Sequence, residues 1–146
     1  MPDSRIEILL VEDNSNDAEL TLRTLRKNNV ANHVLVLTDG QAAVDYLIGD
    51  GSDVEGGAAE LPRVIMLDLK LPKVDGIEVL RRIRGDARTK LIPVVVLTSS
   101  NQESDLVRTY ELGVNSYIVK PVDFSQFAAT VRDVGLYWLL LNHPPG

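Results

Sequence analysis

Acidic, hydroxyl and basic side chains follow the apolar runs of this 146-residue chain, each at the point where a run ends. Glu12 and Asp13 follow the first run, Asp68 lies at the end of the third, Thr98 closes the fourth, and Lys120 closes the fifth. A carboxylate is costly to bury without a partner. Asp68 stands among apolar residues, so its partners must come from the ends of the other runs.

A cluster of these groups favours phosphoryl chemistry. Neighbouring acids repel one another unless a cation lies among them, and a hard divalent ion with oxygen ligands meets that need. We expect magnesium, because it accepts a few carboxylates and takes phosphate oxygens into its remaining positions. Lys120 offers a positive charge and Thr98 a hydroxyl to phosphoryl oxygens. Asp68 is then placed to attack phosphorus and form an aspartyl phosphate.

Parallel strands are expected to position these groups. The apolar runs span residues 6–11, 33–37, 63–69, 92–98 and 116–120. Their continuous apolarity is typical of strands that are covered on both faces. Segments of helical period lie at 17–27, 41–48, 77–84 and 102–112, and a last one begins at 124. This alternation predicts a doubly wound α/β fold, whose strands all present their carboxyl ends at one ligand-binding edge.

The composition indicates one globular domain over residues 1–146. Hydrophobic residues make up 45% of the chain and charged residues 25%, which is typical of folded proteins. The formal net charge of −6 disfavours nucleic acid or an anionic membrane as a partner. Cysteine is absent, which excludes disulfides and thiolate metal sites. The start is not signal-like and no apolar run approaches the roughly 20 residues that span a bilayer, so we expect a cytoplasmic protein.

Four motifs carry a family resemblance: "LLVEDN", "MLDLKLPKVDG", "VVVLTSS" and "SYIVKP". By their order and spacing, residues 5–134 resemble the receiver domain of two-component response regulators. The resemblance implies a flavodoxin-like, five-stranded parallel sheet of order 2-1-3-4-5, with five helices on both faces. It also implies a phosphoacceptor signalling protein rather than an enzyme. Such a protein takes a phosphoryl group from a sensor histidine kinase, assists its own phosphotransfer and slow dephosphorylation, and signals by conformational change.

The resemblance assigns a role to each matching residue of the metal site. Asp68 becomes the phosphoacceptor. Glu12 and Asp13 become the acidic pair that holds Mg²⁺ directly or through water. The backbone carbonyl of Lys70, two residues past the acceptor, completes the protein ligands.

The remaining matches concern the signalling switch. By resemblance, Thr98 moves its hydroxyl toward the phosphoryl group and Lys120 pairs with that group. Tyr117, three residues before the lysine, acts with Thr98 as the aromatic rotamer switch. Lys120 and Pro121 match the family's cis peptide.

Two other functions share the predicted architecture. A magnesium-dependent phosphohydrolase with an aspartyl nucleophile places a second acid two residues beyond the nucleophile, where this chain has Lys70. A flavodoxin-like cofactor carrier needs a phosphate-cradling loop after the first strand, whereas "VEDNSND" presents acids. Simpler interpretations also exist, because the acids and hydroxyls could cap helices or begin turns, and Lys120 could be solvated.

The end of the chain predicts a protein contact. The stretch "GLYWLLLNHPPG" carries six hydrophobic residues from Leu136 to Leu141, more than one helical face holds. Residues 135–146 are interpreted as an extension that forms a homodimer with Trp138 buried between subunits, although they could instead complete the core stripe of the last helix. Because the sequence ends at Gly146, we expect no output domain and predict a stand-alone regulator. The tail resembles that of small regulators partnered with bacterial and cyanobacterial phytochrome kinases.

Overall fold

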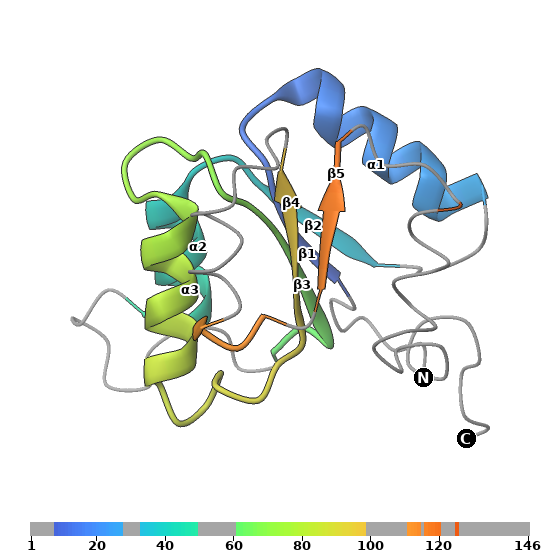
Figure 1. The fold of residues 1–146 in the computed structure, drawn as a ribbon. Coiled ribbons are helices and arrows are strands. Elements are labelled where there is room, and N and C mark those ends of the chain that lie inside the picture. The colour runs from blue at the N-terminus through green and yellow to red at the C-terminus, as the bar shows by residue number, and fades with distance from the viewer. Residues whose placement is uncertain are drawn as a thin grey trace, which may run out of the picture.

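A computed structural model describes residues 8–27, 33–49, 61–98, 111–114, 116–120 and 125 of the chain. Five strands form one parallel sheet in the order β2-β1-β3-β4-β5 (Figure 1). The strands are β1 (Ile8–Val11), β2 (Val34–Leu37), β3 (Val64–Asp68), β4 (Val94–Thr98) and β5 (Ser116–Val119). The predicted flavodoxin-like strand order is therefore confirmed.

Helices lie on both faces of the sheet. The helix α1 (Ser15–Lys27) covers one face, and α2 (Gly40–Leu47) and α3 (Gly76–Gly85) cover the other (Figure 1). The helices expected at 102–112 and from 124 onward lie outside the described residues, apart from Glu111, Leu112 and Ser125, and so does the tail 135–146. Among the described residues, none of the helices combines the length and the apolar composition needed to cross a bilayer.

Each face of the sheet has its own core, because successive strand residues point to opposite sides. Leu9 and Val11 of β1 pack in the core beneath α2 and α3. Ile8 and Leu10 pack in the core beneath α1, which includes Leu25 of that helix. All four β1 side chains are fully buried. Burial on both faces is the physical reason for the unbroken apolar runs of β1 and β3.

The three described helices each begin just after a capping residue. Asn14, Asp39 and Asp75 accept, through a side-chain oxygen, the N–H of the residue three positions later at 2.7–2.9 Å, which satisfies a free amide of the first turn. The helices therefore begin one or two residues before the predicted starts at 17, 41 and 77. At Gly40 a Cβ would lie 1.6 Å from the Val74 carbonyl oxygen, so glycine allows the loops after β2 and β3 to touch.

Candidate functional site

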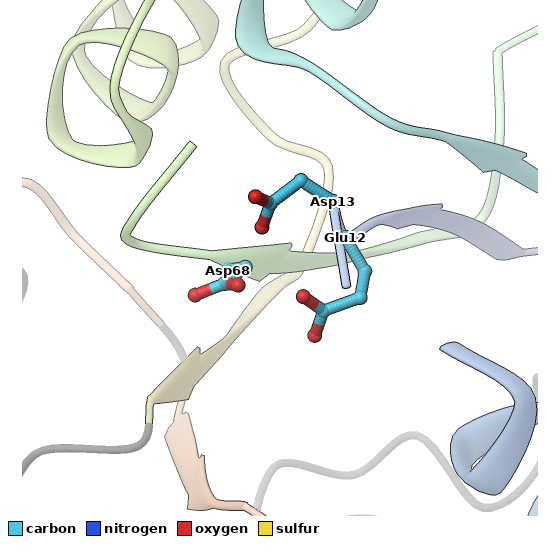
Figure 2. A group of neighbouring side chains, drawn as sticks. All are labelled: Glu12, Asp13 and Asp68. Carbon is cyan, nitrogen blue, oxygen red and sulfur yellow. The ribbon is translucent and has the colours of Figure 1, made fainter. Parts of the chain in front are cut away.

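Three acidic side chains meet at the carboxyl edge of the sheet. Glu12 and Asp13 follow β1, Asp68 ends β3, and the residues that precede Glu12 and Asp68 are register partners in the sheet. One carboxylate oxygen of each acid lies within 4.8 Å of those of the other two, and Figure 2 shows the three groups converging. Glu12 and Asp68 are 1% and 4% exposed, whereas Asp13 is exposed. The fold thus brings together the three acids that the sequence singled out.

Lys120 supplies the buried acids with a cation. Its Nζ donates to Glu12 Oε1 at 3.0 Å and to Asp68 Oδ2 at 3.1 Å. A third acceptor, Asp17 Oδ2 in the first turn of α1, lies at 2.9 Å. The Lys120 side chain is only 9% exposed, so it is not a solvated surface lysine. Lys120 is therefore the partner that a buried Asp68 requires.

Strand alternation explains why these groups meet on the side of the sheet that α1 covers. Glu12, Asp68 and Lys120 each stand two positions after a residue of the core beneath α1, namely Leu10, Met66 and Ile118. Side chains two apart along a strand share a face. The two acids and the lysine therefore project toward the helix that carries Asp17.

One lysine does not compensate the charge of this cluster. Burial raises the pKa of Glu12 from its ordinary 4.5 to about 7, and Asp68 adds to the rise, while Lys120 and the Asn14 N–H oppose it. Burial alone would lower the pKa of Lys120, but hydrogen bonds to its three acids outweigh burial and raise that pKa. Counting Asp17, the described residues place four carboxylates near one ammonium. The oxygens of Glu12, Asp13 and Asp68 are hard donors that suit a divalent ion such as Mg²⁺, so this donor set fits the predicted metal.

Two hydrogen bonds from backbone N–H groups fix the segment that follows Asp68. Asp68 Oδ1 accepts the N–H of Lys70 at 3.1 Å, and the Leu69 carbonyl accepts the N–H of Gly76 at 2.8 Å. A Cβ at Gly76 would lie 2.3 Å from the Asp68 carbonyl oxygen, so only glycine allows α3 to start this close to β3. An open cleft of about 460 Å³ borders this segment, and its lining residues are Asp13, Leu69, Lys70, Leu71, Pro72, Asp75 and Ile77.

Of the other predicted site residues, Thr98 lies at this edge of the sheet by its backbone position, whereas Tyr117 lies further back in its strand and pairs with Val96. Thr98 ends β4 and pairs with Val119, and Tyr117 lies within β5. The side chains of Thr98 and Tyr117 lie outside the described part of the chain, as does Pro121, so their roles stay predictions. The Lys70 side chain is exposed beside the cleft, and the role of its carbonyl as a metal ligand also stays a prediction.

Asp17 is a site residue that the sequence reasoning missed. Its place in the sequence predicts only the start of a helix, where the helix dipole commonly favours an acid. A positional signal was available nonetheless. Because α1 follows Glu12 and Asp13 directly, its first turn must lie at the same sheet edge as those acids.

Known proteins resemble this chain over nearly all of its length. Residues 8–132 match the family model described as the response regulator receiver domain. The chain is 47% identical over 139 residues to the probable methanogenesis regulatory protein FilR2 of Methanothrix harundinacea (strain 6Ac), which covers 95% of this chain and 87% of that protein. It is 39% identical over 132 residues to the response regulator Rcp1 of Synechocystis sp. (strain ATCC 27184 / PCC 6803 / Kazusa), which covers 90% and 88% respectively.

Solved structures agree with this similarity. The bacteriophytochrome response regulator AtBRR matches with a TM-score of 0.79 at 54% identity, over 97% of this chain and 100% of that one. The Mn²⁺-bound form of Rcp1 matches with a TM-score of 0.74 at 37% identity, over 97% and 100%. The phosphorylated cyanobacterial phytochrome response regulator RcpA matches with a TM-score of 0.74 at 38% identity, over 97% of both chains. With the acid and lysine cluster at the expected sheet edge, these matches establish that the chain belongs to the response regulator receiver domain family of two-component signalling.

Proposed function

We propose that Asp68 accepts a phosphoryl group from the phosphohistidine of a sensor histidine kinase, in a reaction that requires Mg²⁺. The observation that carries this proposal is the buried Asp68 carboxylate, which lies 3.1 Å from Lys120 Nζ and within reach of two further acids. The phosphorylated state of the related regulator RcpA supports an acceptor in such a domain.

Glu12, Asp13, Asp68 and the backbone carbonyl of Lys70 would hold the Mg²⁺. The Mn²⁺-bound form of the related regulator Rcp1 supports the binding of a divalent ion by such a domain. When bound, the ion offsets the negative charge of the carboxylates and of the incoming phosphoryl oxygens.

Asp68 acts as the nucleophile. One of its carboxylate oxygens forms a bond to phosphorus while the phosphorus–nitrogen bond of the phosphohistidine breaks. The imidazole nitrogen keeps the electron pair, and the ring, protonated at its other nitrogen, leaves in the neutral form. Lys120, whose Nζ already lies 3.1 Å from Asp68, stabilises the charge on the transferred oxygens. The product is an aspartyl phosphate, a labile anhydride that suits a transient signal.

Thr98 and Tyr117 would transmit the change to the surface. The phosphoryl group adds negative charge and three acceptor oxygens at Asp68. The Thr98 hydroxyl moves toward this group, Tyr117 turns inward, and the surface at β5 and the expected fourth helix changes shape. The response is a shift in population between two packings of one domain that spans residues 1–146.

In this scheme the chain is a phosphoacceptor and not a turnover enzyme. It assists its own phosphotransfer and a slow dephosphorylation. The exposed Lys70 beside the cleft supports this, because a phosphohydrolase requires an acid at that position to activate water. We place the reaction in the cytoplasm, where the kinase has access to ATP.

The test is incubation with phosphoramidate, with Mg²⁺ or with EDTA, followed by intact-mass measurement. The wild type should gain one phosphoryl group in Mg²⁺, and Asp68→Asn should gain none. Asp45→Asn makes the same change at an exposed position of α2 and should behave like the wild type. An adduct on Asp68→Asn, or equal adduct formation in EDTA, would refute the assignment.

A bacteriophytochrome is the proposed partner kinase. The 54% identity to the bacteriophytochrome response regulator AtBRR supports it. In a panel of autophosphorylated histidine kinases, transfer should be fastest from a phytochrome kinase. Equal rates of phosphoryl transfer from unrelated kinases would contradict the proposal of a bacteriophytochrome as the partner kinase.

The last helix and residues 135–146 are the proposed homodimer interface, with Trp138 between the subunits. The six hydrophobic residues from Leu136 to Leu141 support an apolar contact. Light scattering over a range of concentrations should give a dimer mass for the wild type and a monomer mass for Trp138→Ala. An unchanged mass in the variant would mean that the interface lies elsewhere.

A further inference from the structure

Asp17 is the partner of Lys120 that does not belong to the three-acid cluster. Its Oδ2 accepts from Lys120 Nζ at 2.9 Å, and its side chain is 30% exposed. The other two acceptors, Glu12 and Asp68, both belong to the cluster. A metal ion at the cluster would therefore bind two of these Lys120 acceptors, Glu12 and Asp68, but not the third, Asp17.

A bound divalent ion would compete with Lys120 for the oxygens of Glu12 and Asp68. An ammonium group has three N–H donors, and the Lys120 Nζ bonds three carboxylates at 2.9–3.1 Å. A cation at the cluster would draw the oxygens of Glu12 and Asp68 and would also repel the ammonium. Lys120 would lose two of its three acceptors at the stage at which its charge is needed beside Asp68.

Asp17 is held in place independently of the three-acid cluster. Its N–H donates to Asn14 Oδ1 at 2.9 Å, which caps α1. As the third residue of α1, it lies at the positive end of the helix dipole, where a carboxylate is stabilised. Asp17 therefore offers Lys120 an acceptor that stays in position whatever binds at the cluster.

We infer that Asp17 is a positioning residue for phosphoryl transfer, which holds the Lys120 ammonium at the sheet edge while Glu12 and Asp68 engage the metal and the phosphoryl group. The inference rests on the proposed roles of Asp68 and Lys120. Because the Lys120 side chain is only 9% exposed, an ammonium that loses Asp17 stays inside the site. It then binds Glu12 and Asp68 more firmly and competes with the metal for their oxygens.

A double-mutant cycle of Asp17→Asn and Lys120→Met in the full chain tests this inference. The Mg²⁺ dissociation constant is measured by calorimetry, and the rate of phosphorylation is measured with phosphoramidate at saturating Mg²⁺. With Lys120 present, Asp17→Asn should raise the dissociation constant about fivefold and slow phosphorylation about tenfold. In the Lys120→Met background, the same change should alter either quantity by less than about twofold.

Glu19→Gln is the matched control, because it removes a carboxylate of the same helix whose partner is the exposed Arg23. It should leave both quantities unchanged. Thermal unfolding shows which variants are folded, and Lys120→Gln replaces Lys120→Met in the cycle if the latter is unfolded.

Two results would contradict the inference about Asp17 without contradicting the proposed function. One is an equal effect of Asp17→Asn in both backgrounds, which would mean that its charge acts without Lys120. The other is an Asp17→Asn variant that matches the wild type while Asp68→Asn gains no phosphoryl group, which leaves the proposed function intact. A wild type that gains no phosphoryl group in Mg²⁺ would overturn the proposed function and the inference with it.

Discussion

Two basic residues of this receiver domain each donate to three acceptors, but the acceptors differ in chemistry. Lys120 donates to carboxylates that follow β1, begin α1 and end β3. Arg84, in the last turn of α3, donates to the backbone carbonyls of Lys90, Ile92 and Gly113 at 2.8–3.0 Å. A carboxylate can take a proton, a metal ion or a phosphoryl group, whereas a backbone carbonyl keeps its charge distribution. We therefore call the Lys120 contacts exchangeable, because the charge of their acceptors can change, and the Arg84 contacts permanent, because the charge of theirs cannot.

The pKa values of the two residues reflect the same difference. Burial lowers the pKa of Arg84 from its ordinary value, yet a guanidinium stays charged at any working pH. Burial acts on Lys120 in the same direction, but its carboxylate partners reverse the outcome and raise the pKa. Charge at the Lys120 site depends instead on Glu12, whose pKa of about 7 lies in the physiological range.

Lys120→Met has the largest expected effect on stability. It leaves Glu12 and Asp68 buried without their ammonium, which should lower the free energy of unfolding by about 4 kcal/mol at pH 8 in EDTA. Mg²⁺ should then raise the stability of the variant more than that of the wild type, because the ion takes over the role of the ammonium. Urea unfolding with and without Mg²⁺ measures both effects. An equal response to Mg²⁺ in the two proteins would mean that Lys120 contributes only packing.

The pH dependence of stability should follow from Glu12. Its pKa is about 7 in the folded chain against an ordinary 4.5, so between these values the folded state holds a proton that the unfolded state has released. The free energy of unfolding should therefore fall as the pH rises from about 4.5 to about 7, by on the order of 3 kcal/mol.

Urea unfolding in EDTA across this pH range measures the slope. Glu12→Gln removes the titrating group and should flatten the curve. Saturating Mg²⁺ should also flatten it, because a bound cation keeps Glu12 deprotonated. A slope that survives in Glu12→Gln would assign the pH dependence to a different group.

The strands were predictable because burial on both faces imposes an unbroken apolar run. The segment around Met66, in the centre of the sheet, is apolar at every position up to Asp68. The starts of α2 and α3 were less predictable, because each depends on a glycine at which another backbone segment lies too close for a Cβ. Gly40 and Gly76 contribute nothing to an apolar period, and the backbone atoms that they contact come from other segments.

The acids of the site were predictable, whereas the contacts of Lys120 were only partly so. Parallel strands align their carboxyl ends, which is sufficient to bring Glu12 near Asp68. A single lysine after a strand looks like a surface residue, and its burial depends on how α1 lies against the sheet. The contact with Asp17 joins residues 103 positions apart, and no spacing along the chain encodes it.

Arg84→Ala should show what a permanent contact contributes. Loss of hydrogen bonds to three carbonyls should lower the free energy of unfolding by about 2 kcal/mol. Mg²⁺ should stabilise this variant and the wild type equally, because none of these acceptors belongs to the three-acid cluster. Arg84→Lys keeps the charge but lacks the planar fork, so it should recover only part of the loss. Urea unfolding with and without Mg²⁺ tests this. If Mg²⁺ stabilised Arg84→Ala more than the wild type, the contacts of Arg84 would also depend on the metal ion.

Lys73 represents a third kind of contact, in which the acceptor is a carboxylate but the lysine is exposed. Its Nζ lies 3.5 Å from Asp39 Oδ2, and its side chain is 68% exposed, an arrangement that contributes little to stability. Its backbone φ is 70°, in the left-handed region. That conformation costs a residue with a side chain roughly 1–2 kcal/mol.

Lys73→Gly should therefore raise the free energy of unfolding by about 0.5 kcal/mol, because the strain relieved slightly exceeds the added backbone entropy of the unfolded chain. Lys73→Met keeps the strained backbone, removes the charge and should leave stability unchanged in thermal unfolding. If Lys73→Met is destabilised, the exposed ion pair matters more than its geometry suggests. If both variants behave as expected, a basic residue of this domain stabilises it according to the burial of its contacts, and a carboxylate partner alone is not sufficient.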